Sequence, residues 1–241
     1  MKQKLIIKVG ETFPTLVSRR GDFEDWILAG MGGGISNWKI LDVRNGGSLP
    51  AYDSIAGLVI TGSHAMVTDH EDWSERIADW LPGVVEQGIP TLGICYGHQL
   101  LAYAMGGEVG DNPNGLEFGT VDLHLNGAAG DDALFGSFSS SIQGQVCHAQ
   151  AVLSLPPGAR LLASSAMDPY SALVLGACAW GVQFHPEFDR DVLVEYIRTY
   201  RQDLQEQGND PDLLIRDSRD TGHGPELLRR FADIVRVRDA S

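Results

Sequence analysis

Residues 89–102, IPTLGICYGHQLLA, place a short apolar run directly before a helical pattern, with one cysteine at the junction. The run Thr91–Ile94 predicts a β-strand, and the helical pattern begins after Cys95. Gly93 and Gly97 flank the cysteine at equal spacing. Small neighbours allow the sharp strand-to-helix turn that presents a nucleophile, and the helix N-terminus favours the reactive thiolate. A lone cysteine is more often a small core residue, so it is the paired glycines that make Cys95 the candidate nucleophile.

Apolar runs of this kind recur along the chain and alternate with helical patterns. The predicted strands are Leu5–Val9, Trp38–Val43, Gly57–Thr61, Thr91–Ile94, Thr120–Leu125, Gln145–His148, Arg160–Ala163 and Trp180–Phe184. Helical spacing appears at Trp73, Ile77, Leu81 and Val84, and again at Leu193, Ile197 and Tyr200. Near-continuous apolar strands between helices predict a three-layer α/β/α sandwich around a mostly parallel sheet. Close-spaced strands without a long helix between about 110 and 175 predict a local antiparallel excursion.

The last part of the chain differs in composition from the rest. The run Gly208–Pro211 breaks the preceding helix, and charged residues become dense after it. A final helix is predicted to open at Pro225, which suits a first helical position. Its apolar stripe consists of Leu227, Leu228, Phe231, Ile234 and Val235. We therefore expect a domain over residues 1–207 and a C-terminal helical appendage over 208–241 that packs on it.

Composition excludes several classes of partner. The 241 residues carry 18 Lys and Arg against 32 Asp and Glu, a net charge of 18 − 32 = −14. This balance makes nucleic acids and anionic membranes poor partners, and no run approaches the ~20 apolar residues of a membrane span. The first ten residues read as a strand instead of a signal peptide. Three cysteines, an odd number, argue against a disulfide framework and favour a cytoplasmic location.

A second segment, WGVQFHPEF at residues 180–188, also runs from a strand into a turn. Because Pro186 disfavours a helical residue before it, His185 and Glu187 can lie side by side in an extended turn. The carboxylate can then orient one ring nitrogen and leave the other for a thiol. An isolated His-Pro-Glu is more often a surface feature. Since His185 follows Cys95 by 185 − 95 = 90 residues, only strands that end at one sheet edge would bring the two together.

Together, the segments Gly93–Gln99 and Gly181–Glu187 resemble the two motifs of class I, triad-type glutamine amidotransferases. The chain is similar to the amidotransferase domain of GMP synthetase and to stand-alone bacterial relatives of it, over roughly residues 38 to 190. The resemblance implies a flavodoxin-like sandwich. It also implies hydrolysis of the glutamine side-chain amide to glutamate and ammonia through a cysteinyl thioester.

The resemblance assigns catalytic roles to five positions. It makes Cys95 the nucleophile, His185 the general base and acid, and Glu187 the orienting carboxylate. The backbone N–H groups of Ser63 and Tyr96 would form the oxyanion hole, a role that does not depend on the side chain. In this turn the chain has serine where a second glycine is common in the family.

Substrate-binding positions also follow from the resemblance. Gly62 belongs to the glycine-rich turn, and Gln99 lies one helical turn beyond the nucleophile, where the family contacts glutamine. In the segment Cys147–Gln150, which corresponds to Ser-His-Gly-Asp in the GMP synthetase domain, His148 matches whereas Cys147 and Gln150 depart. The departures leave open how the amino-acid end of the substrate is held and whether free glutamine is the preferred substrate.

Three further groups are set aside. The glycine run Gly30–Gly34 follows a helical pattern instead of a strand and lacks the Lys-Ser/Thr of a phosphate loop. A polar loop has spacing that matches no standard zinc site: His64, Asp69, His70 and Glu71. Cys147 and Cys178 form no Cys-x-x-Cys pair and are not predicted to be redox partners. The sequence therefore predicts no cofactor and no metal.

Three functions are carried forward. The first is an amidotransferase that hydrolyses glutamine and supplies ammonia to a separate synthase chain. The second is a hydrolase that acts alone on γ-glutamyl amides or peptides, which the departures at Cys147 and Gln150 keep open. The third is a non-catalytic regulatory subunit, which an intact set of Cys95, His185 and Glu187 disfavours.

Overall fold

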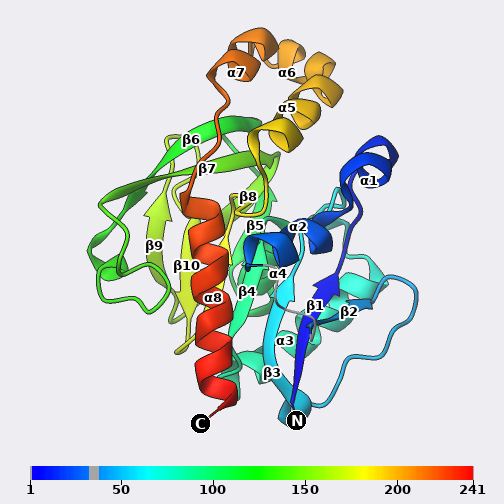
Figure 1. Cartoon of the computed structure of the whole chain (residues 1–241), viewed down its shortest axis with the longest axis vertical. Helices are drawn as coiled ribbons and strands as arrows, with labels where there is room; N and C mark the ends of the chain where they lie inside the picture. Colours follow the sequence, from blue (N-terminus) through cyan, green and yellow to red (C-terminus); the bar gives the residue numbers. More distant parts are fainter. Residues whose placement is uncertain (1, 33–37, 241) are drawn as a thin grey trace.

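The computed structural model describes residues 2–32 and 38–240 (Figure 1). Within these residues nine strands form one sheet in the order β2-β1-β3-β4-β11-β10-β9-β6-β7. The strands of the sheet are β1 Gln3–Lys8, β2 Trp38–Asp42, β3 Ile55–Ile60, β4 Thr91–Ile94, β6 Glu117–Leu125, β7 Ser141–His148, β9 Arg160–Ser164, β10 Ala172–Leu175 and β11 Ala179–Val182. The helices are α1 Pro14–Arg20, α2 Phe23–Gly30, α3 Asp72–Glu86, α4 Tyr96–Ala104, α5 Arg190–Thr199, α6 Arg201–Glu206, α7 Pro211–Asp217 and α8 His223–Asp239, with short 3-10 turns η1 Tyr52–Ser54, η2 Val67–Asp69 and η3 Gly127–Ala129.

The sheet has a parallel half and an antiparallel half. Strands β2, β1, β3, β4 and β11 pair in parallel, whereas β10, β9, β6 and β7 continue the sheet with antiparallel pairing. The antiparallel excursion predicted between residues 110 and 175 is confirmed. Strand β10 is not among the predicted strands, because a four-residue apolar run has no periodicity to identify it. Two further strands, β5 Glu108–Asp111 and β8 Gln150–Ser154, were also not predicted, and they form a separate antiparallel pair.

Both faces of the parallel half are covered by helices, which confirms the predicted sandwich. Side chains alternate across a strand, so Leu5 and Ile7 of β1 enter the core under α3 and α4, while Ile6 enters the core under α2 and α8. All three side chains are buried. Burial on both faces is why these strands are apolar without interruption.

The C-terminal helix α8 packs into the second of these cores. It begins at His223, two residues before the predicted Pro225. The helix tolerates a proline at this place because the N–H groups of a first turn have no helical partner. Leu227, Leu228 and Phe231 are fully buried, and α8 contacts α2 and β3. The division of the chain at residue 207 stays a prediction.

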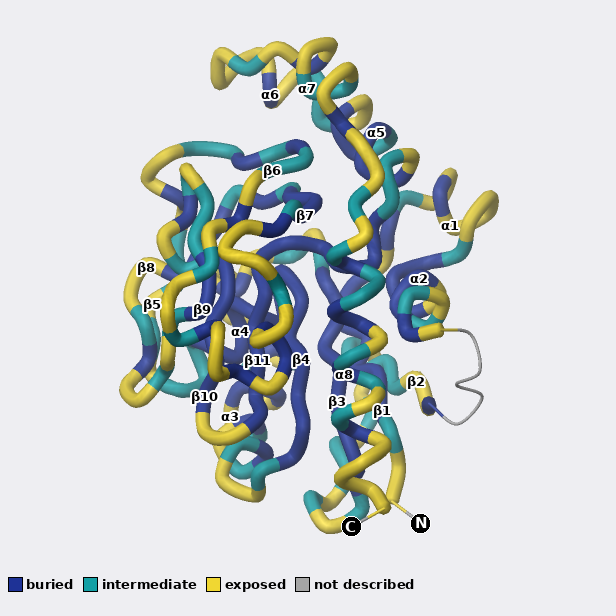
Figure 2. Tube along the Cα trace, turned by 60° about the vertical axis from the view of Figure 1, so that its left-hand side comes forward, coloured by how far each residue is buried: buried dark blue, intermediate teal, exposed yellow. Residues whose placement is uncertain are grey.

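A helical layer lies at one end of the sheet. Figures 1 and 2 show α5, α6 and α7 together above β6 and β7, at the carboxyl end of the parallel strands. Helix α5 contacts β7, and α7 contacts β6. This layer therefore forms a wall over the edge at which β4 and β11 end. No helix in the described part of the chain has the length and apolar character needed to cross a membrane.

Candidate active site

Cys95 lies in the tight turn between β4 and α4, as the sequence predicts. Its backbone has φ 50° and ψ −100°, a region that L-residues other than glycine rarely adopt and that costs of order 1–3 kcal/mol. The turn is held by backbone hydrogen bonds, since Cys95 N–H donates to Val182 O at 2.8 Å and Gln99 N–H donates to Cys95 O at 3.1 Å. The surrounding structure thus fixes a strained nucleophile elbow.

The flanking glycines are required by contacts across this turn. A Cβ on Gly93 would lie 2.3 Å from the carbonyl oxygen of Gly97, and a Cβ on Gly97 would lie 2.6 Å from that of Ile60. Both are backbone atoms, which cannot move aside as a flexible side chain does. The glycine spacing that predicted the elbow therefore has a steric origin.

His185 and Glu187 reach the same sheet edge on the neighbouring strand. Strand β11 pairs with β4 in parallel, with Val182 opposite Ile94, so both chains leave the sheet together. His185 Nδ1–H donates to Glu187 Oε1 at 2.8 Å, and both side chains are buried. The backbone N–H of His185 donates to Gln145 O at 2.7 Å. The histidine ring is therefore oriented by its carboxylate and anchored by its backbone.

Aromatic rings and nearby charges determine the state of this histidine. Phe188 stacks on the imidazole at 4.0 Å between ring centroids. Burial lowers the pKa of His185, but Glu187 and the sulfurs of Cys147 and Cys95 raise it by more, so the pKa is well above its usual value. The site therefore favours the protonated form of this imidazole, which can donate a proton to a leaving group.

The predicted oxyanion donors lie in the turn after β3 and at the start of α4. Neither the N–H of Ser63 nor that of Tyr96 donates a hydrogen bond to another group of the described chain. A Cβ on Gly62 would lie 3.0 Å from His185 Cε1, so this turn passes close to the imidazole. Both N–H groups are free for an oxyanion, and the assignment stays a prediction.

The same turn is tied to α5 through a side chain that the sequence analysis had considered for a metal. His64 stacks on Phe13 at 4.8 Å, and its Nε2 is 3.1 Å from the hydroxyl of Tyr196. That hydroxyl is also 2.9 Å from Thr12 Oγ1. His70 instead bonds Glu75 at 2.8 Å. Among the described residues, no three His, Cys, Asp or Glu side chains are placed to share a metal ion.

Two residues predicted to bind substrate are engaged in the wall of the cavity. Gln99 Nε2 donates to Gln150 O at 2.7 Å and to Gln183 Oε1 at 3.0 Å. His148 Nδ1 lies 2.9 Å from Gln150 O, and its Nε2 lies 2.8 Å from Glu117 Oε2. Both ring nitrogens of His148 are therefore used within the protein, and its contact with a substrate stays a prediction.

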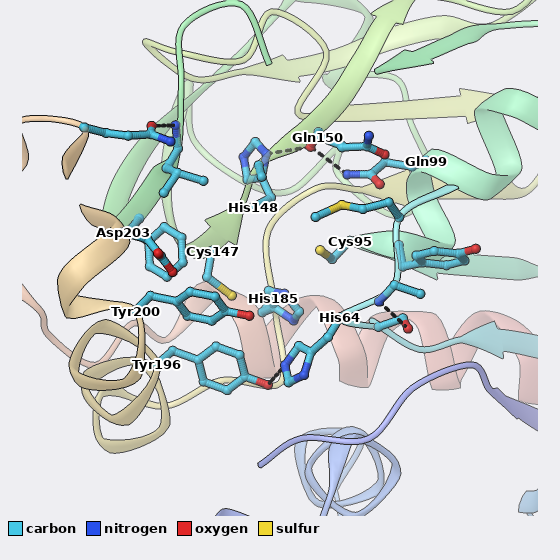
Figure 3. A pocket seen from close by; sticks show the side chains of 18 of the residues that line it. His64, Cys95, Gln99, Cys147, His148, Gln150, His185, Tyr196, Tyr200 and Asp203 are labelled. Carbon is cyan, nitrogen blue, oxygen red and sulfur yellow. Dashed lines mark hydrogen bonds between the residues drawn. The ribbon is translucent and has the colours of Figure 1, made fainter. Parts of the chain in front are cut away.

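A cavity of about 350 Å³ connects the nucleophile to the helical wall. In Figure 3, Cys95 and His185 lie in its middle, Gln99 and Gln150 lie on one side, and Cys147, Tyr200 and Asp203 lie on the other.

Most of this second side has no signal in the sequence. It is lined by Phe118 of β6, Cys147 of β7 and Tyr196, Tyr200 and Asp203 of α5–α6. Of these residues, only Cys147 belongs to a segment, Cys147–Gln150, that the family resemblance placed at the substrate.

Cys147 lies beside His185 in the cavity (Figure 3). Burial raises the pKa of its thiol, and the neighbouring His185 lowers it by less. Cys95, Cys147 and Cys178 are all free thiols. Cys178 is buried instead against Arg238, with Nη1 2.9 Å from its sulfur.

Of the glycine run set aside earlier, Gly33 and Gly34 fall outside the described residues.

The comparisons with known proteins match this geometry. The family model described as glutamine amidotransferase class-I matches residues 49–197, more than half of the chain. The chain belongs to the class-I glutamine amidotransferase family. The resemblance seen in the two motifs is confirmed.

Relatives of this amidotransferase family member carry two kinds of name. A GMP synthase (glutamine-hydrolyzing) of Aeropyrum pernix is 35% identical over 152 residues, which are 61% of this chain and 28% of that protein. γ-Glutamyl peptidase 5 of Arabidopsis thaliana is 31% identical over 205 residues, which are 82% of this chain and 76% of that protein. A solved glutamine amido transferase of Methylobacillus flagellatus is 27% identical, with a TM-score of 0.74 over 99% of this chain and 94% of that chain. The chain thus spans a small part of the synthase and most of the peptidase.

Proposed function

We propose that this chain hydrolyses the side-chain amide of glutamine, or of another γ-glutamyl compound, through a thioester on Cys95. The observation that carries the proposal is the strained elbow at Cys95, next to a histidine whose Nδ1 is bonded to Glu187 at 2.8 Å. Membership of the class-I glutamine amidotransferase family supports it.

Each residue of the catalytic set has its own role in the reaction. The sulfur of Cys95 attacks the γ-carbonyl carbon, and the N–H groups of Ser63 and Tyr96 bind the oxyanion. His185 transfers the thiol proton to the leaving nitrogen, and the C–N bond breaks. His185 then takes a proton from water, whose oxygen attacks the thioester and releases glutamate. Glu187 orients the imidazole and stabilises its charged form.

Two destinations of the leaving group fit this site. In the first, glutamine releases ammonia to a separate synthase chain, which the match to the amidotransferase part of GMP synthases supports. In the second, the protein acts alone on larger γ-glutamyl amides. The cavity that continues past His185, together with the similarity to most of a γ-glutamyl peptidase, favours this second function. The complete catalytic set disfavours a purely regulatory subunit.

Covalent trapping of the nucleophile tests the proposal. A glutamine-analogue electrophile is expected to add one modification, located at Cys95 by intact-mass and peptide analysis. Cys95→Ala is expected to remove both the label and, by about 10⁴-fold or more, the release of glutamate. Cys178→Ala, a cysteine that does not line the cavity, serves as the matched control and keeps both. Labelling of Cys147 or Cys178 with Cys95 unmodified would rule the assignment out.

A further inference from the structure

The cavity is larger on the leaving-group side of the nucleophile than release of ammonia requires. The proton donor to the leaving nitrogen must lie within hydrogen-bond reach of it, so the leaving group of a substrate on Cys95 lies on the His185 side. Figure 3 shows that the cavity continues on this side, past Cys147 to Tyr200 and Asp203. Ammonia is one heavy atom and needs no such extension.

The walls of this extension are apolar, and its far end is acidic. The apolar and aromatic surface comes from Leu116, Phe118 of β6, Tyr196 of α5 and Tyr200 at the end of α5. Asp203 lines the far end, and no ion pair engages its carboxylate in the described part of the chain. Glu206 also lines this end, and among the described residues its carboxylate accepts a side-chain hydrogen bond only from Gln202, at 2.9 Å.

The charges around the cavity favour a cationic ligand group at this end. No lysine or arginine is among the described residues that line it. The carboxylates of Asp203 and Glu206 are therefore not neutralised locally, and an ammonium group placed between them and the aromatic rings gains both ionic and cation–π attraction. A leaving group with a carboxylate at the same position would be repelled.

We propose that the part of the cavity lined by Phe118, Tyr200 and Asp203 is a leaving-group subsite, and that the preferred substrate is the γ-glutamyl amide of an amine with an apolar segment and a second, cationic amino group. This inference rests on the proposed function. The chemistry is a hydrolysis: the γ-carbon bonds to sulfur as the amide C–N bond breaks, and the thiol proton leaves on the amine. Water then replaces sulfur and restores the thiol.

Four substrates separate the effects of size and charge. They are glutamine and its γ-N-methyl, γ-N-pentyl and γ-N-(4-aminobutyl) amides, and release of glutamate gives kcat/KM for each. The three substituted amides have alkylamine leaving groups, and the last two are of equal length. We expect kcat/KM to rise at least ten-fold from N-methyl to N-pentyl, because methylene groups become buried. We expect a further rise of about three-fold from N-pentyl to 4-aminobutyl, typical of a partly exposed ion pair.

Variants test which residues produce these ratios. Asp203→Asn is expected to reduce the 4-aminobutyl to N-pentyl ratio toward one, and Phe118→Ala to reduce the N-pentyl to N-methyl ratio. Asp53→Asn removes an equal charge at an exposed residue that does not line the cavity, and it should keep both ratios. Asp203 is exposed, so its replacement leaves the fold intact even if Phe118→Ala does not.

The outcomes also distinguish the two proposals. Cys95-dependent turnover of glutamine with flat or falling kcat/KM along the amide series would overturn the leaving-group subsite and leave the proposed function in place. A 4-aminobutyl preference that survives Asp203→Asn would overturn the cationic part of it. No turnover of any of the four substrates, together with no electrophile label on Cys95, would overturn the proposed function and this inference with it.

Discussion

At the nucleophile end of the cavity, backbone contacts hold the reactive side chain in place. At the far end, the lining residues are held by the packing of side chains from distant elements. Cys95 is held by two backbone hydrogen bonds and by glycines that allow β3, β4 and α4 to approach closely. Phe118 and Tyr200 meet instead through packing of their rings, 5.5 Å apart, between β6 and the end of α5.

This difference indicates where the protein tolerates amino-acid substitutions. A backbone constraint fails as a whole when one Cβ is added, because neighbouring main chains have no free space. A wall of side chains can be altered one residue at a time and still close the cavity. The nucleophile end of the cavity therefore determines the reaction, and the far end determines which substrates are accepted.

The largest effect is expected within the catalytic pair. His185→Ala should remove nearly all turnover, because this ring transfers a proton in both thioester formation and breakdown. Glu187→Gln should keep activity roughly ten-fold or more above His185→Ala, with the double variant no worse than His185→Ala. Circular dichroism and thermal melting control for folding. If Glu187→Gln were inactive while His185→Ala turned over substrate, these roles would be wrong.

Behind the wall that carries His148, a buried carboxyl predicts a pH dependence of stability. Burial raises the pKa of Asp168 to about 6, aided by Glu117 and opposed by the Tyr170 N–H and by His148. Between pH 4 and 6 the unfolded state loses this proton while the folded state keeps it, so stability falls as pH rises. The free energy of unfolding falls by about 3 kcal/mol in total, since each unit of difference between the folded and unfolded pKa contributes about 1.36 kcal/mol.

Asp168→Asn is the variant that measures this effect. Urea unfolding at pH 4 and pH 6 should show that the fall in free energy of unfolding shrinks in Asp168→Asn. The exposed Asp53→Asn should keep the fall seen in the unmodified protein. An equal fall in the Asp168 variant would show that this carboxyl is not its source.

The elbow offers a direct test of the backbone constraint. Gly97→Ala puts a Cβ 2.6 Å from the Ile60 carbonyl oxygen, and we expect it to lower the free energy of unfolding by about 2 kcal/mol. Gly127→Ala adds a methyl group with no atom within 4 Å and should change stability by less than about 0.5 kcal/mol. Equal stability of the two variants would remove the argument that backbone contact fixes this end.

The smallest effect is expected where the two ends meet. Tyr196→Phe removes the hydroxyl that bonds both His64 and Thr12, and it should cost about 1 kcal/mol of stability. Because His64 anchors the turn that carries the Ser63 N–H, we expect kcat to fall a few-fold with little change in KM. The hydroxyl of Tyr200 bonds neither His64 nor Thr12 in the described chain, so a fall in kcat of the same size from Tyr200→Phe would argue against this coupling.

Local sequence rules were sufficient for the elbow, the second turn and the sandwich. Strand and helix periods, glycine spacing and a proline between His185 and Glu187 act over a few residues, so their consequences can be worked out from neighbours along the chain. The start of α8 was displaced by only two residues, from Pro225 to His223. The short strand β10 was missed because four apolar residues fit either type of element.

What the sequence by itself determined is the class of chemistry, through Cys95, His185 and Glu187 and the turns that hold them. The tertiary structure alone decided that Cys147 contacts His185, that both nitrogens of His148 are used within the protein, and that Asp203 lies at the end of the cavity. These residues come from β7, from the turn after β11 and from α6, whose mutual positions depend on strand order and helix packing. Side-chain contacts between such elements have no signature in any single stretch of chain, because they arise only when the whole core is closed.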